Sequence, residues 1–383
     1  MKKIPVQAML LGLVLTFLNS CSTETQVAAS ERNLTPLVFI HGIKGGKLVN
    51  PKGDTQWLTG AQALSLSTPE LKLPLHWVDD VQERDDLKSD GPLETVKVIP
   101  GLIQQDIYAT WLKAARTSGH PFYSFAYDWR RDNLETLELF SRFIEKVRSE
   151  NGGRKVQLVA HSMGGLISFA VLNQHPENFD SAVFAGVPFA GGVGFLIDLH
   201  AGDSVGTNSR ILSPQVLFTF PSVYTLFPLG GKGLVEEDGS PITMDFYSQP
   251  QWKEKKLGVF SDPARVAAVG SEEKAEAFMA TALAHAKTFR MLLAPRKQNF
   301  PPVLVISNED RPTLVTAIHH GKKSTDGWDL QSAPQAPGDG RVAEHDAFPP
   351  TGVAYDLFLS KAEHTQLLND PKVIERIEIF LKR

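Results

Sequence analysis

The segment VQLVAHSMGGLISFA (156–170) places Ser162 where an apolar, strand-like run gives way to a helix-like one. Small residues flank this serine, with Ala160 before it and Gly164 and Gly165 after it. A tight strand-to-helix turn needs small residues there, because larger side chains would collide with the neighbouring strand and helix. Such a turn exposes the serine hydroxyl at the carboxyl edge of a sheet, beside a helix N-terminus that stabilises developing negative charge. The pattern therefore predicts that Ser162 is a nucleophile.

A histidine base must accompany this serine, because an alcohol is a weak nucleophile at neutral pH. His364 lies in KAEHTQLLND just before the last predicted helix, which is the expected position for the base. Three other histidines compete for this role: His319, His320 and His345. We prefer His364, because the base follows the acid in chain order at sites of this kind and His345 lies close in sequence to the best acid.

Two aspartates compete to orient that histidine. Asp310 follows the apolar run VLVIS (303–307), whereas Asp339 lies in PGDGRVAEHD. The glycines on both sides of Asp339 allow its carboxylate to project from a tight loop. We predict Asp339 as the acid, with Asp310 as the alternative.

An oxyanion hole requires two backbone N–H groups that point to the same place. We expect one from Met163, directly after the nucleophile, and one from Ile43, in the loop after PLVFIHG (36–42). His41 is expected to pack or hydrogen-bond structurally. Because backbone groups do this work, side-chain substitution at Ile43 or Met163 should matter only modestly.

The elements that must position these residues alternate along the chain. Strands are predicted at 36–42, 122–129, 156–160, 181–188 and 301–307, and helices at 108–119, 133–153, 164–176 and 371–383. This alternation favours an α/β fold with a mostly parallel central sheet and helices on both faces. The alternation fails in two segments, which we interpret as a lid-like insertion at about 48–95 and a cap at about 190–295. Both would belong to one catalytic domain over 34–383.

The first residues are typical of a targeting segment. Lys2 and Lys3 precede the apolar run MLLGLVLTFL, and Cys21, the only cysteine, follows in LNSC. LNSC resembles the lipobox of bacterial lipoproteins, so 1–21 is predicted to be a signal peptide and Cys21 the lipidated first mature residue. We expect 22–33 to be a flexible tether and the protein to be lipid-anchored in a bacterial cell envelope. Ser22 favours the outer over the inner membrane.

Composition excludes several other functions. The chain of 383 residues is 42% hydrophobic and carries a formal net charge of −4, without the basic surface of a nucleic-acid-binding protein. Histidines and the cysteine do not cluster at metal-ligand spacing, so we expect neither a metal nor another cofactor. The oligomeric state is left open.

Four motifs together carry a family resemblance. They are FIHGIKGGKL (39–48), YDWRR (127–131), AHSMGG (160–165) and GDGRV (338–342). They resemble the oxyanion loop, the YDWR motif, the nucleophile elbow and the acid loop of the lecithin:cholesterol acyltransferase and lysosomal phospholipase A2 family. The likeness covers about 36–380 and implies the α/β-hydrolase fold with a cap or lid. It also assigns Ser162, Asp339 and His364 position by position.

The sequence departs from the family pattern at three places. HG replaces PG in the oxyanion loop, Arg341 replaces the threonine of GDGTV, and the lid cysteines are absent. These departures leave the lid conformation and the acyl acceptor open. For Tyr127, Asp128, Trp129 and Arg130 we favour a paired, structural charge network.

The resemblance implies a phospholipid or other lipid ester as substrate, cleaved through an acyl-serine. Water as acceptor would make a phospholipase, and an alcohol an O-acyltransferase; the sequence leaves the acceptor, head group and chain length open. The alternatives are a carboxylesterase or triacylglycerol lipase and, remotely, a non-catalytic lipid-binding lipoprotein. Two apolar segments, 57–77 and 216–227, could meet the acyl chain or the membrane surface, or form the core of the cap.

Overall fold

The computed structural model of the protein describes residues 34–99, 103–295 and 299–383. The predicted signal peptide, its lipidation site Cys21 and the tether up to residue 33 lie outside the described residues. None of the described helices combines the length and the apolar character needed to cross a membrane.

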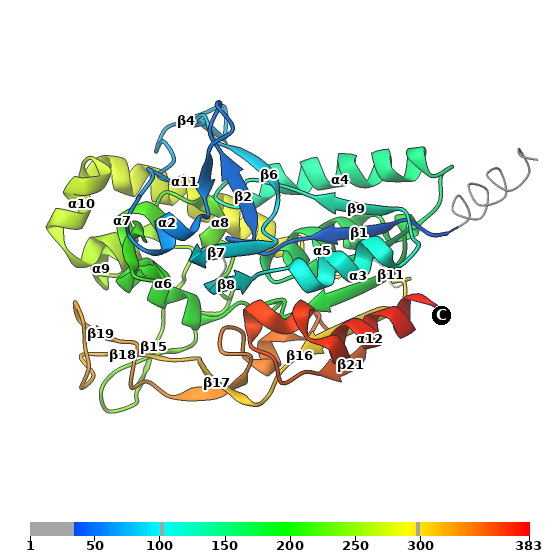
Figure 1. The fold of residues 1–383 in the computed structure, drawn as a ribbon. Helices are drawn as coiled ribbons and strands as arrows, with labels where there is room; N and C mark the ends of the chain where they lie inside the picture. The colour runs from blue at the N-terminus through cyan, green and yellow to red at the C-terminus, as the bar shows by residue number, and fades with distance from the viewer. Residues whose placement is uncertain (1–33, 100–102, 296–298) are drawn as a thin grey trace, which may run out of the picture.

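Six parallel strands form the central sheet (Figure 1). In spatial order they are β21 (Asp356–Leu359), β16 (Val303–Ser307), β11 (Phe179–Ala185), β10 (Val156–His161), β1 (Leu37–Ile40) and β9 (Phe122–Phe125). Strands β1, β10 and β16 are buried along their whole length, as expected of parallel strands covered on both faces. The mostly parallel sheet predicted from the sequence is confirmed.

Four helices cover the two faces of this sheet. They are α3 (Ala109–Thr117), α4 (Asn133–Glu150), α5 (Met163–Gln174) and α12 (Pro371–Leu381). Side chains of α3 and α12 pack with Phe39 and Val159 on one face, and those of α4 and α5 pack with Val38 and Leu158 on the other. These helices confirm the predictions at 108–119, 133–153, 164–176 and 371–383.

Helix α4 shows how the sequence sets such an element. Asp132 caps its N-terminus by accepting a hydrogen bond from Leu134 N, and Phe140, Ile144 and Val147 bury one face at helical spacing. The chain then turns at 152–153, where both glycines have positive φ.

Short strands fill the segment between β1 and β9. They are β2 (Gly46–Val49), β3 (Thr55–Trp57), β4 (Trp77–Val78), β5 (Val81–Gln82), β6 (Lys88–Pro92), β7 (Thr95–Ile99) and β8 (Ile103–Asp106), with the one-turn helix α2 (Gly60–Ala63). Strands β3, β2 and β6 form a small sheet beside the central one (Figure 1). This agrees with the expectation that 48–95 holds no long regular element.

The longer regular elements between β11 and β16 are helices. It contains α6 (Leu196–Ala201), α7 (Pro214–Leu217), α8 (Pro221–Tyr224), α9 (Gln249–Glu254), α10 (Pro263–Val269) and α11 (Glu272–Met291), with strands β12 (Asp203–Val205), β13 (Asn208–Leu212), β14 (Leu234–Val235) and β15 (Pro241–Ile242). The sequence analysis missed α11, which has 20 residues and is capped by Ser271. Aromatic residues of 216–227, including Phe218, Phe220 and Phe227, are buried. Of the two roles considered for this segment, its burial favours that of core.

Short strands also fill the stretch from β16 to the last helix. It contains β17 (Arg311–Leu314), β18 (Ala317–His319), β19 (Trp328–Asp329) and β20 (Gln335–Gly338). Single-turn 3-10 helices lie at Pro176–Asn178, Val193–Phe195, Gly258–Ser261 and Glu344–Ala347, and a longer one at His364–Asn369. Strands β17 and β20 pair antiparallel, which places the loop after β20 at the carboxyl edge of the sheet.

Candidate active site

Ser162 lies on a strained turn between β10 and α5. Its φ of 53° falls in the left-handed region, which side chains adopt at a cost. A Cβ on Gly164 would lie 2.2 Å from the carbonyl oxygen of His41, and one on Gly165 would lie 2.1 Å from Cγ2 of Val187. The packing therefore requires small residues after the serine, as the sequence pattern predicted.

Three side chains from distant segments meet at this turn. The Nε2 atom of His364 lies 3.0 Å from Oγ of Ser162, and its Nδ1 atom lies 2.7 Å from Oδ2 of Asp339. Asp339 is buried, and the His364 side chain is 12% exposed. The structure thus aligns the serine, the histidine and the acid favoured by the sequence in one hydrogen-bonded row. This arrangement can move a proton from Ser162 to His364.

Backbone groups hold the Asp339 carboxylate in place. Its Oδ1 atom accepts hydrogen bonds from the N–H groups of Arg341 and Val342, at 2.9 and 2.7 Å. Burial raises the pKa of this carboxyl, but the charge and hydrogen bond of His364 and the two backbone N–H groups outweigh burial and bring the pKa below its ordinary value. Asp339 is therefore ionised at neutral pH.

The competing candidates lie elsewhere. Asp310 is about half exposed and sits 3.6 Å from Nζ of Lys361. His319 pairs with Glu236 and contacts the ring of His320 at a tilt, while His345 pairs with Asp346. None of these side chains forms a hydrogen bond with Ser162 in the described part of the chain.

The loop after β1 passes directly over the serine. A Cβ on Gly42 would lie 2.8 Å from Cβ of Ser162, so this loop and the first turn of α5 adjoin the same point. Within the described residues, the N–H groups of Ile43 and Met163 have no hydrogen-bond partner. Both are free to stabilise an oxyanion. His41 is buried and stacks on Tyr127 at 4.4 Å, which matches the structural role expected for it.

Two residues that the sequence analysis did not select complete the site. The N–H of Gly42 donates to the hydroxyl of Tyr108 at 3.1 Å, and that hydroxyl lies 2.8 Å from Nδ1 of His161. The Nε2 atom of His161 lies 3.0 Å from the carbonyl oxygen of His364, which can only accept. Nε2 therefore carries the proton, and Tyr108 donates to Nδ1. This chain of hydrogen bonds links the loop after β1 to the backbone of His364.

Burial keeps two histidines at this site neutral. It lowers the pKa of His161 to about 3, and the charge of His364 acts in the same direction. Burial also lowers the pKa of His41 to about 4, against its hydrogen bond with the Gly42 carbonyl. Neither imidazole competes with His364 for the proton of Ser162.

These two histidines should make the protein unstable in acid. Their folded pKa values lie below the ordinary 6.5, so below pH 6.5 the unfolded chain binds more protons and stability falls as pH falls. Two such groups should remove about 2.7 kcal/mol per pH unit between about pH 6 and 4. Urea titrations at several pH values would measure this slope. In His161→Gln, which has no titrating group there, the slope should drop by roughly half; equal slopes would contradict the argument.

A cavity of about 620 Å³ opens beside Ser162. Its lining includes apolar side chains from the segment between β1 and α3, namely Trp57, Leu58, Leu93 and Ile107. It also includes charged side chains, namely Lys44, Asp203, Arg311, Arg341 and Glu363. This mixed lining fits an ester that carries both an apolar chain and a polar group.

Comparison with known proteins places the chain in a family. The family model "Lecithin:cholesterol acyltransferase" matches residues 82–331. The chain belongs to the lecithin:cholesterol acyltransferase family. The matched region includes Ser162 but ends before Asp339 and His364, whose placement here comes from the structure.

Curated relatives from Arabidopsis thaliana match segments of this chain. "Phospholipase A(1) LCAT3" is 30% identical over 144 residues, which are 36% of this chain and 30% of that protein. "Phospholipid:diacylglycerol acyltransferase 1" is 31% identical over 150 residues, which are 34% of this chain and 22% of that protein. The chain thus spans less than a third of the length of either relative.

The fold is that of the α/β-hydrolases. A chain in the crystal structure of the Tle4-Tli4 complex superposes with a TM-score of 0.60 at 13% identity, over 91% of this chain and 98% of that one.

Arg341, which replaces the threonine of the family motif GDGTV, forms an ion pair in the structure. Arg341 pairs with Asp198 of α6 and lies over the ring of Phe195 at 4.8 Å. Lys44 of the oxyanion loop pairs with the same Asp198 at 3.4 Å and with Asp203 at 2.5 Å. The carboxylate of Asp198 therefore ties the loop after β1 to the loop that bears Asp339.

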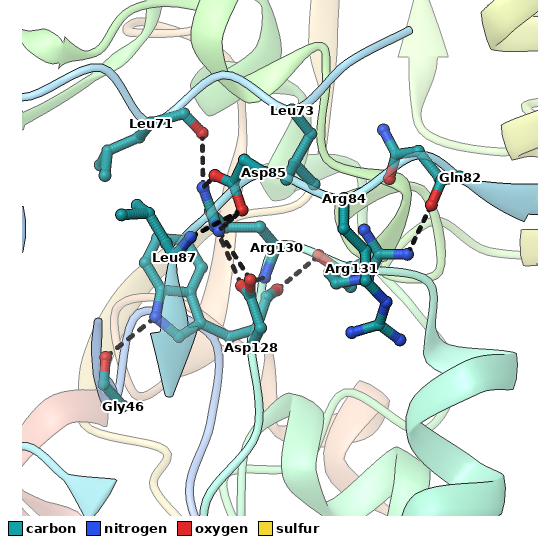
Figure 2. Close-up of polar contacts among 12 residues, drawn as sticks. Gly46, Leu71, Leu73, Gln82, Arg84, Asp85, Leu87, Asp128, Arg130 and Arg131 are labelled. Atoms are coloured by element: carbon teal, nitrogen blue, oxygen red, sulfur yellow. Dashed lines mark hydrogen bonds and ion pairs between the residues drawn. The ribbon is translucent and has the colours of Figure 1, made fainter. Parts of the chain in front are cut away.

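The family motif YDWR anchors the segment before β9. Arg130 is fully buried; its Nη1 atom lies 2.6 Å from Asp85 Oδ2, and its Nη2 atom lies 2.7 Å from Asp128 Oδ2 (Figure 2). Nη1 also donates to the carbonyl oxygen of Leu71 at 3.0 Å, and Trp129 Nε1 donates to that of Gly46. The paired charge network expected from the sequence is present. It fixes 71–85 against the central sheet.

Proposed function

We propose that this protein is a serine-dependent lipid acyl hydrolase or O-acyltransferase. It would cleave an acyl ester of a phospholipid and pass the acyl group to water or to an alcohol. One observation carries the proposal: the hydrogen-bonded row of Ser162, His364 and Asp339 adjoins a cavity that is lined in part by apolar side chains. Membership of the lecithin:cholesterol acyltransferase family supports the lipid ester as substrate.

The first half of the reaction forms an acyl-serine. His364 Nε2 takes the proton of Ser162 Oγ as the oxygen attacks the ester carbonyl, and the N–H groups of Ile43 and Met163 stabilise the oxyanion. Asp339 stabilises the imidazolium through Nδ1–H. The ester C–O bond then breaks, and His364 returns the proton to the leaving glycerol hydroxyl.

The second half repeats these steps with a new nucleophile. Water or an alcohol gives its proton to His364, attacks the acyl-serine and releases a fatty acid or a new ester. Ser162 regains its proton from His364. The water supply in the cavity decides between the two products.

Product analysis by mass spectrometry tests this function. The purified protein would be mixed with phospholipid vesicles that contain a long-chain alcohol or a sterol, with Ser162→Ala as the matched control. Free fatty acid alone indicates a phospholipase, and an acylated alcohol indicates a transferase. Cleavage of short soluble esters without either lipid product would replace the proposal by a carboxylesterase. A Ser162→Ala protein as active as the wild type would refute the serine mechanism.

We also propose that 1–21 is a lipoprotein signal peptide and that Cys21 carries the lipid anchor, with 22–33 as tether to the outer membrane of a bacterial envelope. The apolar run followed by LNSC supports this. Cell fractionation after labelling with a radioactive fatty acid should find label in the membrane fraction. Cys21→Ala should abolish the label, and a variant that keeps it would contradict the proposal.

A further inference from the structure

The turn that contains Ile43 has a backbone conformation that favours glycine at a position where this chain has lysine. The N–H of Gly45 donates to the carbonyl oxygen of Gly42 at 3.1 Å and closes a four-residue turn. Lys44 is the third residue of this turn, and its φ is 63°. A positive φ at that position favours glycine or asparagine, because a longer side chain strains the backbone. The turn therefore depends on contacts that Lys44 makes outside it.

The side chain of Lys44 is bound by two carboxylates. Its Nζ atom lies 3.4 Å from Oδ2 of Asp198 and 2.5 Å from Oδ2 of Asp203. The side chains of Lys44 and Asp198 are only 21% and 14% exposed, so the solvent screens this pair less than a surface pair. The indole Nε1 of Trp57 also donates to the carbonyl oxygen of Lys44, at 2.8 Å. Together these contacts keep the residue after Ile43 in its left-handed conformation.

Asp198 also contacts the loop that bears the acid. Its carboxylate pairs with the guanidinium of Arg341, whose backbone N–H donates to Oδ1 of Asp339 at 2.9 Å. The same guanidinium lies over the ring of Phe195 at 4.8 Å. Burial raises the pKa of Asp198, but the charges and hydrogen bonds of Arg341 and Lys44 outweigh burial and bring the pKa below its ordinary value. Asp198 is therefore an anion between two cations.

Helix α6, which carries Asp198, is itself firmly packed. Leu199 and His200 of this helix are buried. The Nδ1 atom of His200 accepts the N–H of Gly258 at 3.2 Å, so its Nε2 atom carries a proton and donates to the carbonyl oxygen of Thr325 at 3.0 Å. The carboxylate of Asp198 thus extends from a support that is fixed on several sides.

We propose that Asp198 is a positioning residue for ester cleavage. Through Lys44 it holds the turn that presents the N–H of Ile43 to the oxyanion. Through Arg341 it holds the carboxylate of Asp339 against the histidine base. This inference rests on the proposed function and deepens it, because Asp198 itself contacts neither the nucleophile nor the base in the described part of the chain. Misplaced oxyanion donors weaken the transition state more than the bound substrate, so the effect should fall on kcat.

The variant Asp198→Asn tests this role, because it removes the charge and keeps the size of the side chain. On a short soluble ester its kcat should fall by about 30-fold, while KM stays within about twofold. The kcat would be calculated per active site titrated with a phosphonate, so unfolded protein does not count. An unchanged or increased kcat would refute the proposal: without the carboxylate, two unpaired cations remain near the oxyanion, and charge alone would then accelerate the reaction. A change in KM alone would also refute it.

A double-mutant cycle shows whether Asp198 acts through the two cations. In a Lys44→Met, Arg341→Met background, Asp198→Asn should lower kcat by less than about twofold further, since nothing is left for the carboxylate to hold. A 30-fold loss in this background as well would mean that Asp198 acts through other contacts, and the proposal would be wrong.

Asp245→Asn is the matched control. Asp245 lies in the same segment between β11 and β16, pairs with Lys287 at 3.3 Å, is 41% exposed and does not line the cavity. Its replacement should leave kcat within about twofold of the wild type. An equal loss in Asp245→Asn and Asp198→Asn would show that any ion pair of this segment matters, and would remove the special role of Asp198.

The wild-type protein separates this inference from the function beneath it. If the wild type cleaves esters and Asp198→Asn does so equally well, the positioning role is wrong and the proposed function stands. If the wild type cleaves neither lipid nor soluble esters, the proposed function itself fails.

Discussion

Replacing Asp339 by asparagine should lower kcat by about 10⁴-fold and leave the protein folded. The Oδ1 atom of Asp339 accepts two backbone N–H groups, so the corresponding atom of an asparagine must remain the oxygen. Its NH₂ group is then forced into the Oδ2 position, 2.7 Å from Nδ1 of His364. Because NH₂ can only donate, Nδ1 must accept and the proton moves to Nε2. An Nε2–H cannot take the proton of Ser162, so the base is held in its inactive tautomer.

Steady-state kinetics on a short soluble ester would measure this loss independently of lipid binding. The matched control is Asp310→Asn, because Asp310 is the other acid that the sequence offered and is about half exposed. It should retain full activity, and both variants should unfold in urea within about 1 kcal/mol of the wild type, since neither loses side-chain volume. A full loss in Asp310→Asn with activity kept in Asp339→Asn would reverse the assignment of the acid.

Replacing Arg130 by methionine should cost about 3–5 kcal/mol of the free energy of unfolding. The change leaves Asp85 and Asp128 without the cation between them and the Leu71 carbonyl without its donor. Burial lowers the pKa of Arg130, but the hydrogen bonds and charges of Asp128 and Asp85 outweigh burial and raise it, so the native pair is fully ionised. Two partly buried carboxylates are expensive when unpaired, and a domain is commonly stable by only about 5–15 kcal/mol.

Urea denaturation followed by circular dichroism would test this effect. Arg142→Met removes an arginine that is 68% exposed and 3.7 Å from Glu138, and should change stability by less than about 0.5 kcal/mol. Adding Asp85→Asn and Asp128→Asn to Arg130→Met should recover part of the loss, because no carboxylate is then left unpaired. A loss in Arg130→Met no larger than in Arg142→Met would show that the network does not anchor the segment.

The sequence predicted the structure where all the residues that constrain a feature lie within one short segment. The turn around Ser162 needs small residues on both sides, and its neighbours are a few positions away in the chain, so the motif is readable without the fold. The same holds for the glycines around Asp339 and for the apolar spacing of α4. These local patterns predicted five of the six strands of the central sheet, its four covering helices and the candidate nucleophile, acid and base; the edge strand β21 (Asp356–Leu359) was not predicted.

Contacts between distant segments could not be read in this way. Tyr108 contacts Gly42, which is 66 residues away in the sequence, and His161, which is 53 residues away. No motif in the sequence around Tyr108 predicts these contacts. Asp85, which pairs with Arg130 from outside the YDWRR motif, is also distant from it in the sequence. The start of helix α11 has a typical N-terminal pattern, because Ser271 is followed by Glu272 and Glu273 and then by an alanine-rich run. This pattern was overlooked because the surrounding sequence is rich in glycine and proline.

The position of strand β21 at the edge of the sheet has a consequence for the growing polypeptide. Ser162 and His364 are 202 residues apart, and the loop that bears His364 begins only after β21 has paired with β16. The segments of β1, β9, β10 and β11 and the serine turn are therefore synthesised well before His364. The proposed cleavage of esters would become possible only at the very end of synthesis, when the segment that bears His364 docks beside that turn.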